Sequence, residues 1–207
     1  LPSGAFNLVM GSGGKVGNTL IHSDQIHAVS FTGSLPVGRQ VASATAANLV
    51  KCQLEMGSKN ALIVAADANL EVAVNAAFVG AYSGTGQKCT ASSRLIVDAS
   101  IFDEFVAKLG EKLSATRVGH ALEDGVDMGP IASEEQLEAN LAWIQRGLEE
   151  GAQLVQGGER ISLDKPGYYM SPALFVDTDN AMAINREELF APIASVIKAN
   201  DYEHALE

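Results

Sequence analysis

The sequence predicts an α/β fold with mostly parallel sheets that carry helices on both faces. Apolar, strand-like runs alternate with helical patterns along the chain. Of the 207 residues 47% are apolar, enough for one large domain or for two smaller units with their own cores. No internal repeat, low-complexity tract or long linker interrupts the alternation. Strand alternating with helix favours parallel pairing, because each crossover helix then covers one sheet face.

Strand and helix signals alternate in the first quarter of the chain. Pro36 fits the first turn of a helix, where its missing N–H has no intrahelical partner. The predicted elements are a strand at 6–11, a glycine turn opening a helix at 13–23, a strand at 26–34, a helix at 35–49 and a short buried strand at 52–57.

The remaining three quarters continue the pattern with longer helices. The helix predicted at 67–91 is strongly apolar and has an aspartate at its start, whereas the one at 101–115 is amphipathic. The predicted strands are 60–66, 93–100, 154–158, 168–177 and 194–200, the predicted helices are 67–91, 101–115 and 134–153, and 126–133 is a loop.

Charge and cysteine content exclude several classes of function. The formal charge is −11 and no lysine or arginine run occurs, which disfavours nucleic acid or an anionic membrane surface as partner. Cys52 and Cys89 give neither a disulfide framework nor metal-ligand spacing, so we expect no metal site and a reducing, cytoplasmic setting. No apolar run approaches the roughly 18 to 20 residues that span a bilayer. The abrupt start leads us to expect a piece of a longer protein.

A glycine-rich segment, "GSGGKVG", contains Gly11, Gly13 and Gly17 between a predicted strand and a helix. Glycines there let a phosphate approach the helix N-terminus, which is the logic of dinucleotide binding. A plain structural turn explains the segment equally well, because no convincing acidic residue follows about 20 residues later.

Four motifs resemble the aldehyde dehydrogenase superfamily in order and spacing: "VSFTGSLPVGRQVA", "LEMGSKNALIV", "GTGQKCTASSR" and "REELFAPIASV". Within it, the chain is most similar to the bacterial α-ketoglutaric (2-oxoglutarate) semialdehyde dehydrogenases. The resemblance implies residues 1–56 as the C-terminal part of a Rossmann-type NAD(P)-binding domain and residues 57–207 as a catalytic domain, incomplete at its C-terminal end. It also implies NAD or NADP as cofactor and a homo-oligomer, dimer or tetramer, for the full-length protein.

The resemblance assigns the chemistry to two residues. Cys89 matches the nucleophile, which attacks the aldehyde to give a thiohemiacetal and then a thioester. Glu55 matches the general base that activates water for hydrolysis, and its neighbours Leu54 and Met56 suggest a partly apolar setting. The backbone N–H of Cys89 supplies one oxyanion donor, while the family's second donor, an asparagine, falls upstream of Leu1. We therefore expect the 207 residues alone to be inactive.

The cofactor residues are carried over in the same way. Gly33 and Ser34 match residues that approach the pyrophosphate and nicotinamide side, and Gly13, Gly17 and Val37 match the walls of the adenine site.

Later in the chain, Glu188 matches the carboxylate that accepts from the nicotinamide-ribose hydroxyls, and Phe190 matches the ring beside it. The chain departs from the family pattern at Ser58 and Ala191, where glycine is usual.

Two residues beside the nucleophile bear on the substrate, a small-molecule aldehyde. Lys88 offers a cation and Ser83 a small polar group, which together suit a carboxylate-bearing semialdehyde such as 2-oxoglutarate semialdehyde. A lysine that points to solvent is nearly as good an interpretation, so a succinate-semialdehyde dehydrogenase or a broad-specificity aldehyde dehydrogenase stays open.

The alternative from a different functional class is a non-catalytic module that kept the fold. Glu55 disfavours a relative that transfers its acyl group to coenzyme A.

Overall fold

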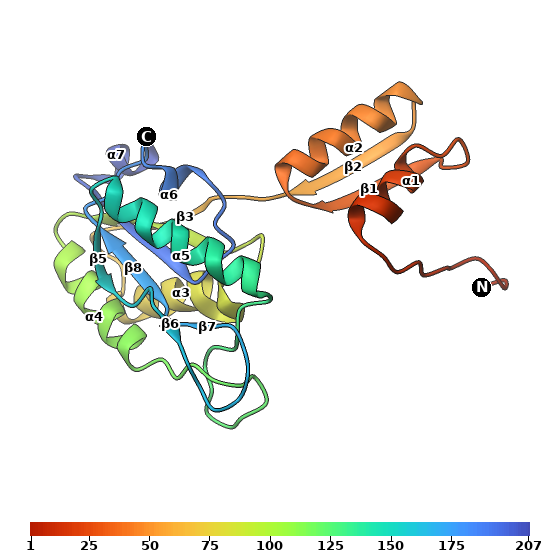
Figure 1. Cartoon of the computed structure of the whole chain (residues 1–207). Helices are drawn as coiled ribbons and strands as arrows, with labels where there is room; N and C mark the ends of the chain where they lie inside the picture. Colours follow the sequence, from red (N-terminus) through yellow and green to blue (C-terminus); the bar gives the residue numbers. More distant parts are fainter. The chain divides into compact units, whose positions relative to one another are not determined.

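The computed structural model describes residues 1–207, which form two compact units, Leu1–Gly57 and Ser58–Glu207 (Figure 1). Each unit has its own sheet and its own helices. The assignment of residues 1–56 to cofactor binding and 57–207 to catalysis stays a prediction.

The first unit is a strand–helix–strand motif preceded by a short helical segment. Strands β1 and β2 pair in parallel, with Ala28 opposite Lys51 and Gly33 opposite Met56. Helix α2 packs on them closely because Gly38 has no side chain: a Cβ there would clash with the sulfur of Met56. In chain order the elements are a π-helical turn (Gly13–Gly17), α1 (Asn18–Ile21), β1 (Ala28–Gly33), α2 (Leu35–Ala47) and β2 (Lys51–Met56).

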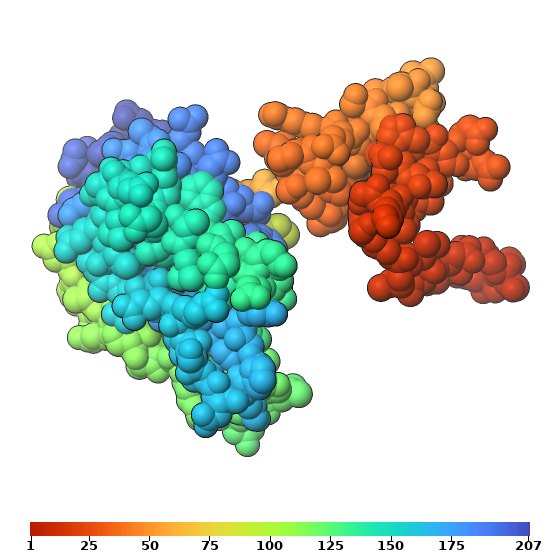
Figure 2. Space-filling view, viewed as in Figure 1, coloured from red at the N-terminus to blue at the C-terminus, as the bar shows by residue number.

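The strand predicted at 6–11 is wrong. These residues form no regular element, and the segment extends from the rest of the first unit (Figures 1 and 2, red). Phe6, Leu8 and Met10 are 77% or more exposed. A strand needs a neighbour for its N–H and C=O groups, and the sheet of this unit consists of β1 and β2 alone.

The second unit is built on a five-stranded sheet in the order β3-β4-β9-β8-β5. All its pairs are parallel except β5 with β8, which confirms the mostly parallel prediction. The elements are β3 (Asn60–Val64), α3 (Leu70–Tyr82), a 3₁₀ turn (Ser83–Gly86), β4 (Ser92–Asp98), α4 (Phe102–Ser114), α5 (Glu134–Glu149), β5 (Gln153–Gln156), β6 (Arg160–Ile161), β7 (Tyr169–Met170), β8 (Ala173–Val176), α6 (Ala183–Arg186), β9 (Ile193–Ala199) and α7 (Tyr202–Leu206).

Helices cover both faces of this sheet, as the sequence predicts. On one face, α3 and α4 pack over a core that includes Leu95, Phe105 and Val196. On the other, α5 and α6 pack over a second core that includes Leu137 and Phe175 (Figure 1). Consecutive residues of a strand point to opposite faces, so β8 and β9 contribute to both cores, while Ile96 of β4 packs in a third, smaller core with Ala199 and Ala205.

Helix α3 is shorter than the predicted 67–91. It begins after Asn69, whose side-chain oxygen accepts from the N–H of Val72, and it ends at Tyr82. Gly84, Thr85 and Gly86 then adopt left-handed conformations that no α-helix can contain. The nucleophile candidate therefore lies on a loop between α3 and β4.

One charged side chain is largely buried in the second unit. Lys59, next to the start of β3, has its pKa lowered from 10.5 to about 8, chiefly by burial and then by the charge of Arg94. Glu188 and Glu187 act in the opposite direction and offset part of this shift. A charged lysine held this way opposes folding.

We predict that replacing Lys59 by methionine stabilises the second unit in a pH-dependent way. Below about pH 8 the lysine is charged in the folded and the unfolded chain, so the full cost is present. Between about pH 8 and 10.5 only the unfolded chain binds the proton, so the free energy of unfolding of the unsubstituted protein rises with pH. Lys59→Met should raise that free energy by up to roughly 3 kcal/mol at pH 7, and the gain should shrink toward pH 10.5.

Urea unfolding followed by the fluorescence of Trp143, the only tryptophan of the chain, checks this prediction. Lys108→Met on the exposed face of α4 is the matched control and should show no such pH-dependent gain. An equal gain for Lys59→Met at pH 7 and pH 10.5 would contradict the lowered pKa.

Candidate active site

The first unit gathers its candidate residues at the carboxyl ends of its two strands. Glu55 lies opposite Thr32 in the register, and Gly33 ends β1. Ser34 follows as the N-cap of α2, and its hydroxyl makes no capping hydrogen bond. An unused hydroxyl beside the N-terminus of a thirteen-residue helix is suited to donate a hydrogen bond to an anionic group.

Glu55 does not have the partly apolar setting that its neighbours suggested. Leu54 and Met56 point to the opposite face of β2 and are partly buried, whereas Glu55 is exposed in its unit. Its only side-chain hydrogen bond is the one that Gln53 Nε2 donates at 3.4 Å. In this unit the carboxylate is free to bind water.

A pocket of about 690 Å³ opens in the first unit. Gly13, Gly17 and Val37 line it together with apolar side chains of α1, β1 and α2, such as Leu20 and Val29. The structure thus brings the three residues predicted for the adenine site into one pocket, while Gly33 and Ser34 lie outside its lining.

In the second unit the candidate residues lie at the amino ends of strands β3, β4 and β9, whereas those of the first unit lie at the carboxyl ends of its strands. These strands are adjacent and parallel: Asn60 pairs with Ser92, and Arg94 with Ser195. The segments that lead into them, 58–60, 84–91 and 187–192, therefore meet at one edge of the sheet.

The loop that carries Cys89 is held in a strained conformation. Thr85 has φ 58° although it is β-branched, and Gly86 has φ 64°. A Cβ on Gly86 would clash with the backbone oxygen of Ala191, so only glycine allows these two segments to approach. Gln87 Oε1 accepts from the N–H of Ala132 at 3.1 Å, which ties the loop to the segment before α5.

Cys89 itself is exposed, in a turn rather than at a helix start. Its N–H donates to no protein group, so it is free to donate to a ligand oxygen.

Of the two residues predicted to contact the substrate, Ser83 is exposed at the end of α3. Lys88 donates from Nζ to the carbonyl of Val79 at 2.8 Å, which commits one of its three N–H groups to the end of that helix.

The Glu188 segment is held from two sides. The N–H of Ser58 donates to Glu188 Oε1 at 3.4 Å, and Gln136 Nε2 donates to the carbonyl of Leu189 at 3.2 Å. Phe190 has φ 53° and is 39% exposed. Glu188 and Phe190 are thereby presented at the same sheet edge as Cys89.

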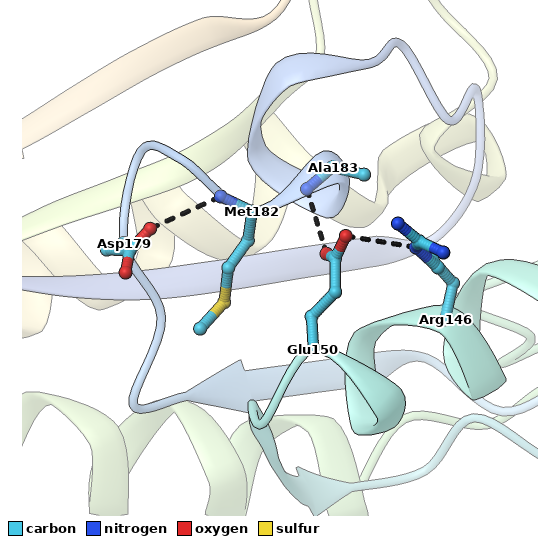
Figure 3. Close-up of polar contacts among 5 residues, drawn as sticks. All are labelled: Arg146, Glu150, Asp179, Met182 and Ala183. Atoms are coloured by element: carbon cyan, nitrogen blue, oxygen red, sulfur yellow. Dashed lines mark hydrogen bonds and ion pairs between the residues drawn. The ribbon is translucent and has the colours of Figure 1, made fainter.

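Carboxylates fix the chain just before that segment (Figure 3). Glu150, at the end of α5, accepts from the N–H of Ala183 at 2.8 Å and pairs with Arg146 Nε at 2.9 Å. Asp179 Oδ1 accepts from the N–H of Met182 at 3.2 Å. These bonds satisfy N–H groups at the start of the short helix α6, which leads directly into the Glu188 segment.

The predicted site residues are thus divided between the units. The first holds Glu55 and the residues predicted to contact the pyrophosphate and adenosine, and the second holds Cys89, Glu188 and Phe190.

The His, Cys, Asp and Glu side chains form no cluster that could hold a metal ion, and none of the helices has both the length and the apolar character for crossing a membrane.

Two residues that support the site were not predicted as functional. Gln87 ties down the nucleophile loop, and Asn60 donates from Nδ2 to the carbonyl of Cys89 at 3.1 Å. The sequence holds one usable signal: polar residues at the start of neighbouring parallel strands share a sheet edge, so Asn60 lies near the residues before Ser92.

The chain is similar to known proteins over its whole length. The profile of the family described as "Aldehyde dehydrogenase family" matches residues 1–207. The alpha-ketoglutaric semialdehyde dehydrogenase of Bacillus subtilis is 46% identical over 208 residues, which cover 100% of this chain and 43% of the relative. The chain therefore spans less than half the length of that relative.

Solved structures share the fold. A betaine aldehyde dehydrogenase of Staphylococcus aureus, solved in complex with NAD+, superposes with a TM-score of 0.93 at 32% identity, over 96% of this chain and 40% of that one. HpcC of Thermus thermophilus superposes with a TM-score of 0.95 at 39% identity, over 100% of this chain and 41% of that one. Because the family profile matches from the first residue to the last, the chain belongs to the aldehyde dehydrogenase family.

Proposed function

We propose that these residues form the nucleophile-bearing part of an NAD(P)-dependent aldehyde dehydrogenase. The observation that carries the proposal is the exposed thiol of Cys89, whose own N–H lacks a protein acceptor, at the same sheet edge as Glu188. A module that only bound partners would need neither a free thiol nor a free N–H on a strained loop.

Cys89 supplies the covalent step. Its thiolate attacks the aldehyde carbon, a C–S bond forms, and the carbonyl oxygen becomes an oxyanion that the Cys89 N–H stabilises. When the oxyanion collapses, hydride leaves the carbon and a thioester remains on Cys89.

Cofactor binding fits the residues present in both units. The pocket of Gly13, Gly17 and Val37 is apolar and suits an adenine ring, and the unused Ser34 hydroxyl suits a phosphate. The exposed Glu188 carboxylate suits ribose hydroxyls. Bound NAD or NADP would accept the hydride.

Glu55 completes the cycle by hydrolysis. The carboxylate takes a proton from water as the water oxygen attacks the thioester carbon. The C–S bond then breaks, the carboxylic acid is released, and the proton held by Glu55 passes to the departing sulfur, which restores the thiol of Cys89 and the Glu55 carboxylate.

For the substrate we propose an acidic semialdehyde such as 2-oxoglutarate semialdehyde. The Bacillus subtilis relative supports this class by name, and Lys88 has two N–H groups left for a carboxylate. The name of the Staphylococcus aureus neighbour, betaine aldehyde dehydrogenase, points instead to a cationic substrate.

Cys89→Ala should abolish aldehyde oxidation. We expect NAD(P)H formation to fall by about 10³-fold or more, because the covalent step is lost, while cofactor affinity stays near that of the unsubstituted protein. Kinetics and calorimetry on the full natural chain that contains these residues check both parts. Cys52→Ala, in the first unit, is the control; unchanged turnover in Cys89→Ala would overturn the nucleophile assignment.

Glu55→Gln should let the thioester accumulate. Deacylation is expected to slow by about 10²-fold or more, since the general base is lost, so mass spectrometry after one turnover should find an acyl adduct on Cys89. Glu71→Gln, on an exposed residue of the first turn of α3, should accumulate none. Normal turnover without an adduct in Glu55→Gln would remove Glu55 from the mechanism.

Lys88→Met tests the substrate class. Losing a charge-assisted hydrogen bond should raise KM for 2-oxoglutarate semialdehyde about tenfold and leave KM for betaine aldehyde unchanged. Lys108→Met serves again as the control. Equal effects on both aldehydes would show that Lys88 does not select a carboxylate.

A further inference from the structure

The short segment before β3 contacts both functional segments of the second unit. Asn60 Nδ2 donates to the carbonyl of Cys89 at 3.1 Å. Ser58 Oγ lies 2.7 Å from Asn60 Oδ1, and the Ser58 N–H donates to Glu188 Oε1 at 3.4 Å. One tripeptide therefore joins the nucleophile loop to the segment that carries Glu188.

The chemistry of these groups fixes the orientation of the Asn60 amide. The Cys89 carbonyl can only accept a hydrogen bond, so the Asn60 atom that faces it must be the nitrogen. The amide oxygen then faces Ser58, whose hydroxyl has a proton to donate. In the reverse orientation two oxygens would face each other, and this contact would be lost.

The contact restrains the backbone on the C-terminal side of the nucleophile. A hydrogen bond to the Cys89 carbonyl orients the peptide between Cys89 and Thr90, and thus limits rotation about the Cα–C bond of Cys89. On the N-terminal side, Gln87 and Lys88 are held by their own bonds to Ala132 and Val79. Cys89, with its free N–H, lies between these two restraints.

We infer that Asn60 is a positioning residue for the nucleophile: it holds the Cys89 carbonyl so that the thiol and the free N–H face the same substrate carbonyl, and Ser58 orients its amide. This role rests on the function proposed above. Asn60 does not touch substrate. It acts through Cys89, and its effect falls on the covalent step rather than on cofactor binding.

Asn60→Asp removes the donor at nearly constant side-chain size and adds a negative charge. The carboxylate keeps the size of the amide and still accepts from Ser58, but it has no N–H for the Cys89 carbonyl. In the full natural chain, kcat should fall about tenfold or more, while KM for the cofactor stays within about a factor of two. The matched control is Asn69→Asp, which makes the same charge change at the N-cap of α3 and preserves its acceptor.

Asn60→Ala removes the donor without adding a charge. Comparing it with Asn60→Asp therefore separates the loss of the hydrogen bond to the Cys89 carbonyl from the electrostatic effect of the new carboxylate. Its kcat should fall to a similar extent. If both Asn60 variants stay within a factor of two of Asn69→Asp in kcat, the positioning role is wrong.

Ser58 is tested by a pair of variants. Ser58→Ala loses the hydroxyl, whereas Ser58→Thr keeps it, and both keep the N–H that donates to Glu188. The kcat of Ser58→Ala should be several-fold below that of Ser58→Thr, about the effect of one neutral hydrogen bond. Equal kcat values would overturn the part assigned to Ser58.

A spectroscopic measurement separates this inference from the proposed function. Cys89–Thr90 is the only Cys–Thr pair among the 207 residues. Labelling with ¹³C′-cysteine and ¹⁵N-threonine marks this peptide, and its signal is assigned as the one that Cys89→Ala removes. That signal should shift in both Asn60 variants and not in Asn69→Asp. An unshifted signal would overturn the contact itself. If the unsubstituted protein oxidised no aldehyde while the signal shifted, the proposed function would fail and the contact would stand.

Discussion

Parallel pairing of β3, β4 and β9 is the constraint on which the second unit depends. Parallel strands place all their amino ends at one edge, so three segments that are far apart in sequence meet there. The register pins them: a shift of one residue in β9 would turn every side chain of that strand to the other face and displace the Glu188 segment. The two cores, each built on one face of the sheet, resist such a shift.

A rigid sheet allows a strained loop beside it. Residues 84–86 all have left-handed backbone conformations, and each such conformation in a non-glycine residue costs of order 1 kcal/mol or more. The hydrogen bond from Ala132 to Gln87 and the close approach of Gly86 to Ala191 hold the loop in this conformation. The strain leaves Cys89 exposed with its N–H unused, which a relaxed helix would not do.

Local pattern was enough to predict most of the fold. Apolar periodicity located the central strands and the amphipathic helix α4, because burial on a sheet or helix face imposes that periodicity. It failed at two places: the apolar run at 6–11 finds no strand to pair with, and α3 ends at Tyr82, before the left-handed residues 84–86. The motif residues Cys89 and Glu188 could be placed at one edge only through the strand order, which no local pattern encodes. Asn60 was missed for the same reason, since its partner lies 29 residues away.

The contact between Gly86 and Ala191 also bears on which substitutions natural variants of this chain can carry. At position 86 the neighbouring atom is a backbone oxygen, so every side chain is excluded. At position 191 the contact is made by the backbone, which every amino acid shares, so the alanine found there is compatible with it although glycine is usual in the family. This contact thus constrains two touching positions unequally: position 86 accepts only glycine, whereas the side chain at position 191 can change without disturbing the contact.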